Sequence, residues 1–303
     1  MNSTTLGIVG YGEVGKIFAT GLQGKDGIAG ICAWDLNFQA SALADTERAH
    51  ADAHRVQPVQ GMADLCERAT LIMSAVTASN TLAVAEEAAR HLRAGTVFLD
   101  LNSASPGTKQ QAARAIDGAG GRYVEAGVMT SVPPYGIAVP MLLGGSQAET
   151  LAQTLTGWGM NARAVAPEIG VASAIKMCRS IMIKGMEALV IESYSTARRY
   201  GVEAHVLPTF EETFPQIDWE RTGAYFFSRV AQHGKRRAEE MRESARTVQE
   251  AGFPPLMAAA IAEKHDWVAT QAREGAFRDM PSDAPWQAWA DRLIERSGKE
   301  SSS

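Results

Sequence analysis

Three glycines near residue 10 have the spacing of a phosphate-binding turn. They are Gly10, Gly12 and Gly15, in the segment Gly10-Tyr11-Gly12-Glu13-Val14-Gly15. The apolar segment Leu6–Val9 before them is typical of a buried strand, and apolar residues at helical spacing follow them. Gly10 permits a tight turn, Gly12 leaves room for a phosphate, and Gly15 lets the helix pack closely on the strand. The pattern predicts a strand, a turn and a helix N-terminus that bind the pyrophosphate of a dinucleotide.

An acidic residue follows the second apolar segment at the distance that a bound ribose requires. The segment Gly30–Trp34 ends in Asp35, and a carboxylate about 20 residues beyond the glycines can bind the ribose 2′-hydroxyl. A cap or loop acid is the alternative, since Asn37 and Ser41 follow. A carboxylate at Asp35 would repel a 2′-phosphate. The sequence therefore favours NAD as the cofactor, and NADP stays open.

Lys176 is the candidate for proton transfer. It lies among apolar residues on a predicted helix, and an ammonium group in apolar surroundings loses its proton more readily than one in water. Oxidation of an alcohol needs a base for the hydroxyl proton, and the reverse reaction needs an acid, so Lys176 could serve both directions. Arg179 and Ser180 share its helix face and could bind a carboxylate and a hydroxyl. The alternative is a lysine whose charge is paired at a domain interface.

The first half of the chain alternates short apolar segments with helical patterns, which predicts a parallel sheet built from βαβ units. Predicted strands cover residues 6–9, 30–35, 70–76, 96–101, 122–126, 138–143 and 162–166. Predicted helices cover residues 38–53, 62–68, 77–92, 109–116 and 147–158. The strand 138–143 is a candidate for an antiparallel strand at the sheet edge.

Beyond residue 167 the apolar period becomes helical and no strand pattern returns. A helix over 170–200 is apolar on most sides, which predicts that it is largely buried. Further helices are predicted over 203–214, 217–232, 234–251, 254–274 and 283–296. The predicted fold is α/β. A Rossmann-type doubly wound domain covers residues 1–166, and an all-helical domain for substrate binding and dimerisation covers residues 167–303.

Ligands of open α/β sheets bind beyond the carboxyl ends of the strands. We therefore expect the cofactor across the first four strand ends, and the reacting molecule between the sheet and the long helix. The predicted cofactor-binding residues are Gly10, Tyr11, Gly12, Glu13, Val14, Gly15, Asp35, Val76, Thr77 and Asn102.

Composition excludes several classes of partner. The net charge is −5 and the longest basic block is Lys235–Arg237, so we expect no nucleic-acid partner. No apolar segment approaches the length of a membrane span, so we expect no membrane partner. Three cysteines far apart in the sequence favour a reducing, cytoplasmic compartment. His50 and His54 could share a helix face, but we expect them to be solvated and predict no metal site.

Four segments resemble the β-hydroxyacid dehydrogenase family, the group of 3-hydroxyisobutyrate and 6-phosphogluconate dehydrogenases. They are Gly10–Gly15, Asp100–Pro106, Glu125–Val128 and Gly170–Lys176. The resemblance covers nearly the whole chain. It implies that Lys176 is the catalytic acid and base, and that the helical domain forms a homodimer.

The chain departs from that family where the substrate binds. The family's Ser-Gly-Gly corresponds to Met129-Thr130-Ser131, and its two Asn after the lysine correspond to Arg179 and Ser180. The departures resemble a phosphogluconate dehydrogenase-like branch with a divergent C-terminal domain. The predicted substrate-binding residues are Met129, Thr130, Ser131, Arg179, Ser180 and His233, the last of which could instead lie on a solvated helix face.

These observations predict an NAD(P)-dependent enzyme that transfers a hydride between the nicotinamide and a hydroxyl-bearing carbon. A β-hydroxy acid or a related alcohol is the expected small-molecule substrate. An imine reductase and a non-catalytic NAD-binding sensor are the alternatives.

Overall fold

The computed structural model describes residues 3–40 and 43–300 of the chain. Its packing divides the chain into two compact units, Met1–Met177 and Cys178–Ser303. The division falls inside helix α8 (Val171–Tyr200), just after Lys176. The domain boundary after residue 166 stays a prediction.

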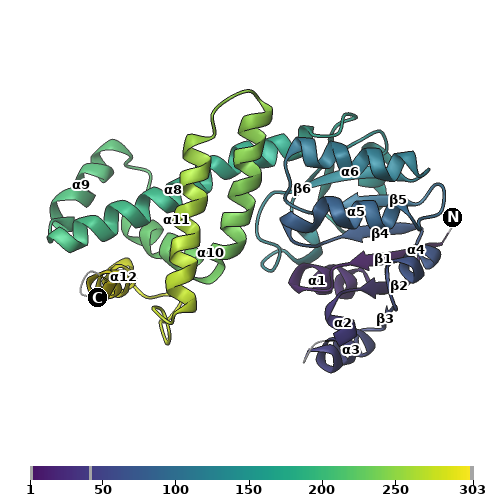
Figure 1. Ribbon diagram of the computed structural model, residues 1–303, viewed down its shortest axis with the longest axis horizontal. Helices are drawn as coiled ribbons and strands as arrows, with labels where there is room; N and C mark the ends of the chain where they lie inside the picture. The colour runs from purple at the N-terminus through teal and green to yellow at the C-terminus, as the bar shows by residue number, and fades with distance from the viewer. Residues whose placement is uncertain (1–2, 41–42, 301–303) are drawn as a thin grey trace. The chain divides into compact units, whose positions relative to one another are not determined.

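The first unit is built on one sheet, whose strands lie in the order β3-β2-β1-β4-β5-β6-β7-β8. Figure 1 shows the strands from β3 to β6 side by side in this order. The six strands from β3 to β6 are parallel and follow the order of a Rossmann fold. Their bounds, with those of the last two strands, are β1 (Thr4–Val9), β2 (Ile28–Trp34), β3 (Val56–Pro58), β4 (Leu71–Ser74), β5 (Val97–Asp100), β6 (Arg122–Val128), β7 (Met141–Gly144) and β8 (Ala162–Ala166). The α/β fold class is confirmed.

Two details of the sheet differ from the predictions. Strand β3 was not predicted, because it has only three residues and ends in Pro58, a residue type confined to sheet edges. Strand β7 pairs antiparallel with β6, as predicted, but it is not the edge strand. Strand β8 lies outside it in a parallel pair.

The core of the first unit explains why its strands read as continuous apolar segments. All four residues of β4 are buried, and Leu6 and Ile8 of β1 have exposed fractions of 0% and 1%. A strand that is buried on both of its faces needs helices on both sides of the sheet. These helices are α1 (Glu13–Leu22), α2 (Asn37–Ala40), α3 (Ala44–Ala53), α4 (Met62–Arg68), α5 (Thr81–Ala89), α6 (Pro106–Gly118) and α7 (Ala148–Gly157).

Helix boundaries in the first unit follow local capping. The single helix predicted over 38–53 is wrong, since α2 and α3 are separate and residues 41–42 lie outside the described chain. Helix α6 begins at Pro106, earlier than predicted, because the Ser105 hydroxyl accepts a hydrogen bond of 3.2 Å from Thr108 N. A serine cap followed by proline in the first turn is a strong start for a helix.

The described part of the second unit is helical and contains the rest of α8, with α9 (Glu203–Thr213), α10 (Trp219–Glu250), α11 (Leu256–Arg273) and α12 (Trp286–Glu300). The predicted break at Gly234 is wrong, since α10 runs through it. A Cβ at Gly234 would lie 2.8 Å from the carbonyl oxygen of His265, so the glycine serves close packing of α10 on α11. Within the described ranges, no helix combines the length and the apolarity needed to cross a membrane.

Helix α8 is less buried than its composition predicts. Met182 and Leu189, two helical turns apart, are 67% and 58% exposed. The apolar residues of its other face join an aromatic core that includes Tyr194, Phe227 and Trp286. One apolar stripe of the helix therefore faces outward.

A buried polar cluster lies beside this core. Glu187 accepts hydrogen bonds from Arg237, one of them 2.7 Å from Nε to Oε2, and Lys184 pairs with Glu240 at 2.7 Å. His265 has an exposed fraction of 0%, and among the described residues neither of its ring nitrogens has a hydrogen-bond partner. Glu187 Oε2 lies 3.8 Å from His265 Nε2. Burial and the positive charges of Arg237 and Lys184 lower the pKa of His265 to about 3, against a raising effect of Glu240.

The buried histidine predicts that stability falls in mild acid. Below pH 6.5 the unfolded chain protonates His265 and the folded chain does not, so the unfolding free energy drops by about 1.4 kcal/mol per pH unit, down to a pH near 3. At pH 5 the loss from this residue is roughly 2 kcal/mol. Urea unfolding at pH 7.5 and pH 5 measures it in the wild type, in His265→Gln and in the exposed control His205→Gln. Equal pH dependence in all three proteins would contradict the assignment.

Candidate functional site

The glycine turn has the geometry that its sequence predicts. Gly10 has a φ of +90°, and a Cβ there would lie 2.5 Å from the carbonyl oxygen of Ala75. A Cβ at Gly15 would lie 1.9 Å from the carbonyl oxygen of Gly10. Gly12 is the N-cap of α1, and the space that its Cβ would occupy is empty to 4 Å. An open N-cap at a helix N-terminus is the cradle that a pyrophosphate requires.

Asp35 lies at the carboxyl end of β2, beside this turn. Its Oδ2 accepts a hydrogen bond of 2.6 Å from the backbone N of Tyr11, and its Oδ1 accepts one of 2.8 Å from the N of Asn37. The carboxylate is therefore fixed to the turn that would bind the phosphates. The contact with Asn37 is that of a loop acid, the alternative interpretation of this residue. The role of Asp35 toward a ribose stays a prediction.

Tyr11 can offer a cofactor only its backbone. Its side chain is 1% exposed, and its hydroxyl lies 3.1 Å from Nδ1 of His50 on α3. Burial, with a smaller contribution from Glu47, raises the pKa of Tyr11 to about 12. The tyrosine packs the turn onto α3, where His50 stacks on His54.

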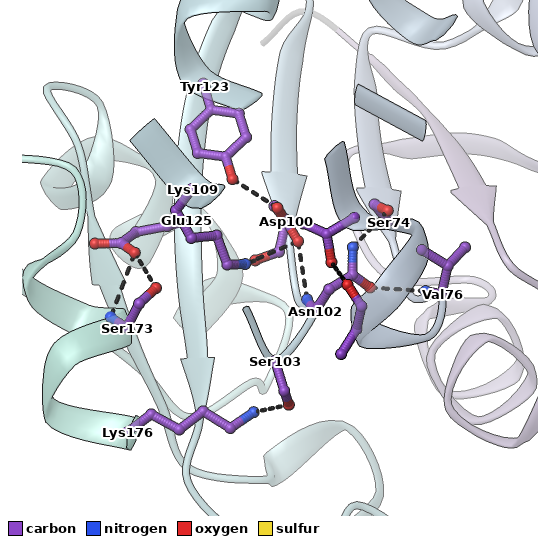
Figure 2. Close-up of polar contacts among 12 residues, drawn as sticks. Ser74, Val76, Asp100, Asn102, Ser103, Lys109, Tyr123, Glu125, Ser173 and Lys176 are labelled. Atoms are coloured by element: carbon purple, nitrogen blue, oxygen red, sulfur yellow. Dashed lines mark hydrogen bonds and ion pairs between the residues drawn. The ribbon is translucent and has the colours of Figure 1, made fainter. Parts of the chain in front are cut away.

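The ends of β4 and β5 are joined by Asn102. Its Oδ1 accepts a hydrogen bond of 2.7 Å from Val76 N, and its Nδ2 donates one of 3.0 Å to Ser74 Oγ (Figure 2). Beyond Val76, the hydroxyl of Thr77 accepts a hydrogen bond of 2.9 Å from Asn80. The three predicted residues Val76, Thr77 and Asn102 thus lie at neighbouring strand ends, with the amide of Asn102 engaged by the protein.

Lys176 reaches the same edge of the sheet from α8. Its Nζ lies 2.5 Å from Oγ of Ser103, and its side chain is partly exposed (Figure 2). Ser103 was not among the predicted site residues. The signal for it was its place directly after Asn102, at a strand end. An amine hydrogen-bonded to a hydroxyl is an arrangement that can transfer a proton.

The loop that carries Ser103 is held by a buried ion pair. Asp100 is fully buried and accepts contacts from Lys109 Nζ at 2.8 Å and from the Tyr123 hydroxyl at 2.6 Å. It also accepts a hydrogen bond of 2.9 Å from Asn102 N. Burial and the Asp100 charge raise the pKa of Tyr123 well above its ordinary value, so its hydroxyl keeps its proton.

The end of β6 leads into the loop predicted to bind substrate. Met129 is partly exposed and donates its N–H to the carbonyl oxygen of Pro140 at 2.9 Å, while Thr130 is exposed and Ser131 partly exposed. The same loop packs on α1 through Ile137, whose Cγ2 would lie 2.4 Å from a Cβ at Gly21. The loop is thereby anchored on the helix that begins at the glycine turn.

The remaining predicted substrate residues belong to the second unit. Arg179 is exposed and His233 is partly exposed, while Ser180 is buried and accepts a hydrogen bond of 3.2 Å from Lys184 Nζ. Their role toward a substrate stays a prediction.

The glycine turn offers a matched pair of substitutions. Gly15→Ala forces a methyl group onto the carbonyl oxygen of Gly10, so we expect a loss of more than about 2 kcal/mol in unfolding free energy. Gly12→Ala enters open space and should change it by less than about 0.5 kcal/mol. Urea unfolding of both variants tests this, and equal stability of the two would contradict the described turn.

Comparison with known proteins agrees with this geometry. Residues 5–159 match the family model described as the NAD binding domain of 6-phosphogluconate dehydrogenase. Residues 197–268 match DUF1932, a domain of unknown function. The first match covers about half of the chain.

Solved structures extend the likeness to both units. A conserved hypothetical protein from Sinorhizobium meliloti 1021 is 38% identical with a TM-score of 0.76, over 97% of this chain and 96% of that one. The conserved protein MTH1747, described as structurally similar to 3-hydroxyacid dehydrogenases, is 29% identical with a TM-score of 0.68, over 89% and 98%. A Mycobacterium tuberculosis 3-hydroxyisobutyrate dehydrogenase shares the fold at 15% identity with a TM-score of 0.69, over 96% and 99%.

The predicted resemblance is therefore confirmed. The chain belongs to the family defined by the NAD binding domain of 6-phosphogluconate dehydrogenase.

Proposed function

We propose that the chain oxidises a β-hydroxy acid or a related alcohol with NAD, or reduces the corresponding carbonyl compound with NADH. The observation that carries the proposal is the contact of 2.5 Å between Lys176 Nζ and Ser103 Oγ. Both residues belong to the unit that contains the glycine turn. When bound, the nicotinamide accepts or supplies the hydride.

The glycine turn would hold the cofactor by its pyrophosphate. The first N–H groups of a helix lack partners within it, and the helix dipole favours an anion at that end. Gly12 leaves the approach open. Asn102 fixes the backbone N of Val76, which keeps the ends of β4 and β5 together beside the proposed nicotinamide position.

Lys176 would move the proton that accompanies hydride transfer. In alcohol oxidation the amine of Lys176 accepts the hydroxyl proton, and in the reverse direction its ammonium form returns it. Ser103 Oγ accepts a hydrogen bond from Lys176 Nζ, so the serine O–H can donate a hydrogen bond to the substrate oxygen. Together they would hold the reacting oxygen and pass its proton.

A second copy of the chain would cover the outward stripe of α8. Met182 and Leu189 share one face of that helix and are largely exposed. Exposed apolar residues on one helix face favour association with another surface, and the family resemblance implies a dimer. We propose a homodimer built on the helical unit.

Asp35 should decide the choice between NAD and NADP. We expect Asp35→Asn to shift the ratio of the two dissociation constants toward NADPH by roughly tenfold, because the carboxylate that repels a 2′-phosphate is lost. The amide keeps an oxygen for Tyr11 N or Asn37 N. Fluorescence titration with NADH and NADPH measures the ratio, with the exposed acid variant Asp45→Asn as control. An unchanged ratio would count against the ribose role of Asp35.

Lys176→Ala should abolish turnover and spare cofactor binding. We expect kcat to fall on the order of 100-fold or more, and the NADH dissociation constant to stay within about twofold. Ser103→Ala should lower kcat by roughly tenfold. The assay is a panel of β-hydroxy acids and aryl-substituted alcohols with NAD or NADP, and the exposed lysine variant Lys235→Ala is the control.

Three outcomes of that panel would contradict the proposal. Full activity of Lys176→Ala would remove the lysine from the reaction. No turnover of any alcohol in the panel, together with reduction of imines by NADH or NADPH in a parallel assay, would identify an imine reductase. Tight NADH binding without any turnover would favour a sensor.

A further inference from the structure

We infer that Glu125 is a positioning residue, whose carboxylate caps the first turn of α8 and so fixes Lys176 against Ser103. The inference deepens the proposed function and rests on it for the role of Lys176. Glu125 itself lies on β6 and has an exposed fraction of 0%. It acts on Lys176 through the first turn of the helix that carries this lysine.

The contacts of Glu125 are those of a helix cap supplied by another element. Its Oε1 accepts hydrogen bonds of 2.6 Å from Gly170 N and 3.1 Å from Ala172 N. Its Oε2 accepts one of 3.3 Å from Ser173 N and another from the Ser173 hydroxyl (Figure 2). The first N–H groups of a helix lack partners within it, and a carboxylate at the positive end of the helix dipole is stabilised. Four donors thus converge on one buried anion.

The capped turn leads directly to the lysine. Lys176 follows Ser173 by three positions and Ala172 by four, so all three lie on one face of α8. A rotation or a shift of the first turn would move the Lys176 amine by a similar amount. The carboxylate therefore sets both the depth and the rotation of the helix at the site.

Two glycines make room for this contact. A Cβ at Gly127 would lie 2.9 Å from the carbonyl oxygen of Ala172, and a Cβ at Gly144 would lie 2.5 Å from Glu125 Oε1. Side chains at these positions on β6 and β7 would push the helix or the carboxylate away. The close approach of α8 to the sheet thus depends on Glu125 and on the two glycines, Gly127 and Gly144.

The partner of Lys176 is fixed by the neighbouring strand. Asp100 on β5 is the register partner of Glu125 on β6, and the Lys109 ion pair holds it in place. Ser103 follows Asp100 in the loop beyond β5. Two buried carboxylates on adjacent strands therefore position the two residues of the contact. Glu125 positions Lys176 through α8, and Asp100 positions Ser103 through the loop beyond β5.

Glu125→Gln tests the inference with little change in shape. All four partners of the carboxylate are donors. In Glu125→Gln the NH2 group of the amide would face some of these donors and could not accept their hydrogen bonds. The first turn of α8 should shift, and the Lys176 amine should lose its place against Ser103. Glu168→Gln is the matched control, because Glu168 is an exposed acid just before the same helix.

The first measurement does not require a known substrate. Pulsed acetylation with an N-hydroxysuccinimide ester, read by mass spectrometry, gives the rate at which Lys176 is modified. We expect that rate to rise by roughly threefold in Glu125→Gln and to stay unchanged in Glu168→Gln. A wild-type rate in folded Glu125→Gln would overturn the inference.

The second measurement separates positioning from a purely structural role. With a substrate that the wild type turns over, Glu125→Gln should lower kcat on the order of 10-fold to 100-fold and shift the pH profile of kcat. The KM for the nicotinamide cofactor should stay unchanged. Loss of stability alone would leave the pH profile of the folded enzyme in place, and that result would overturn the inference. Altered lysine labelling with no turnover in any panel would support positioning and reject the proposed reaction.

If Glu125→Gln does not fold, Ser173→Ala replaces it in the labelling experiment. It removes one of the four donors and leaves three backbone N–H groups on the carboxylate. We expect Lys176 labelling to rise by about twofold. Labelling equal to that of Glu168→Gln would overturn the inference.

Discussion

The buried carboxylate of Glu125 at the start of α8 is the contact on which the candidate site depends. It lies on a strand of the sheet, and its partners lie at the N-terminus of the helix that carries Lys176. A carboxylate removed from water is costly unless donors surround it, and here the helix supplies them. The same set of hydrogen bonds satisfies the anion, caps the helix and brings a lysine amine to the edge of the sheet.

A second buried carboxylate, Asp100, supports the loop that carries Ser103, and it is compensated in a different way. Asp100 is equally buried, but it is compensated by the ammonium of Lys109 and by the Tyr123 hydroxyl. Buried ion pairs add little net stability, because desolvation offsets their attraction. Their strict geometry instead fixes the loop of Asn102 and Ser103. At the first strand end, Gly15 leaves no room for a Cβ against the carbonyl oxygen of Gly10, and Ile137 packs on α1 at Gly21.

Local patterns predicted much of the fold. Glycine spacing, apolar period and the order of strands and helices predicted the Rossmann-type unit, because each depends on residues close in sequence. The short strand β3 and the continuity of α10 through Gly234 were missed, since an edge position and helix–helix packing decided them. Ser103 and Glu125 were not predicted as site residues, because their partners lie 73 and 45 positions away. The segments Asp100–Pro106 and Glu125–Val128 carried the family resemblance, but only the fold brings Ser103 to Lys176 and Glu125 to the helix that carries this lysine.

We propose that Lys176 and Ser103 handle the proton that leaves or enters the substrate when a hydride is transferred at the nicotinamide. A crystal structure of the chain with NADH tests it without knowledge of the substrate. We expect the pyrophosphate to lie on the N-terminus of α1, and nicotinamide C4 to lie within about 6 Å of Lys176 Nζ, which leaves room for one hydroxyl-bearing carbon. A nicotinamide directed away from Lys176 and Ser103, with its C4 far beyond that distance, would contradict the account.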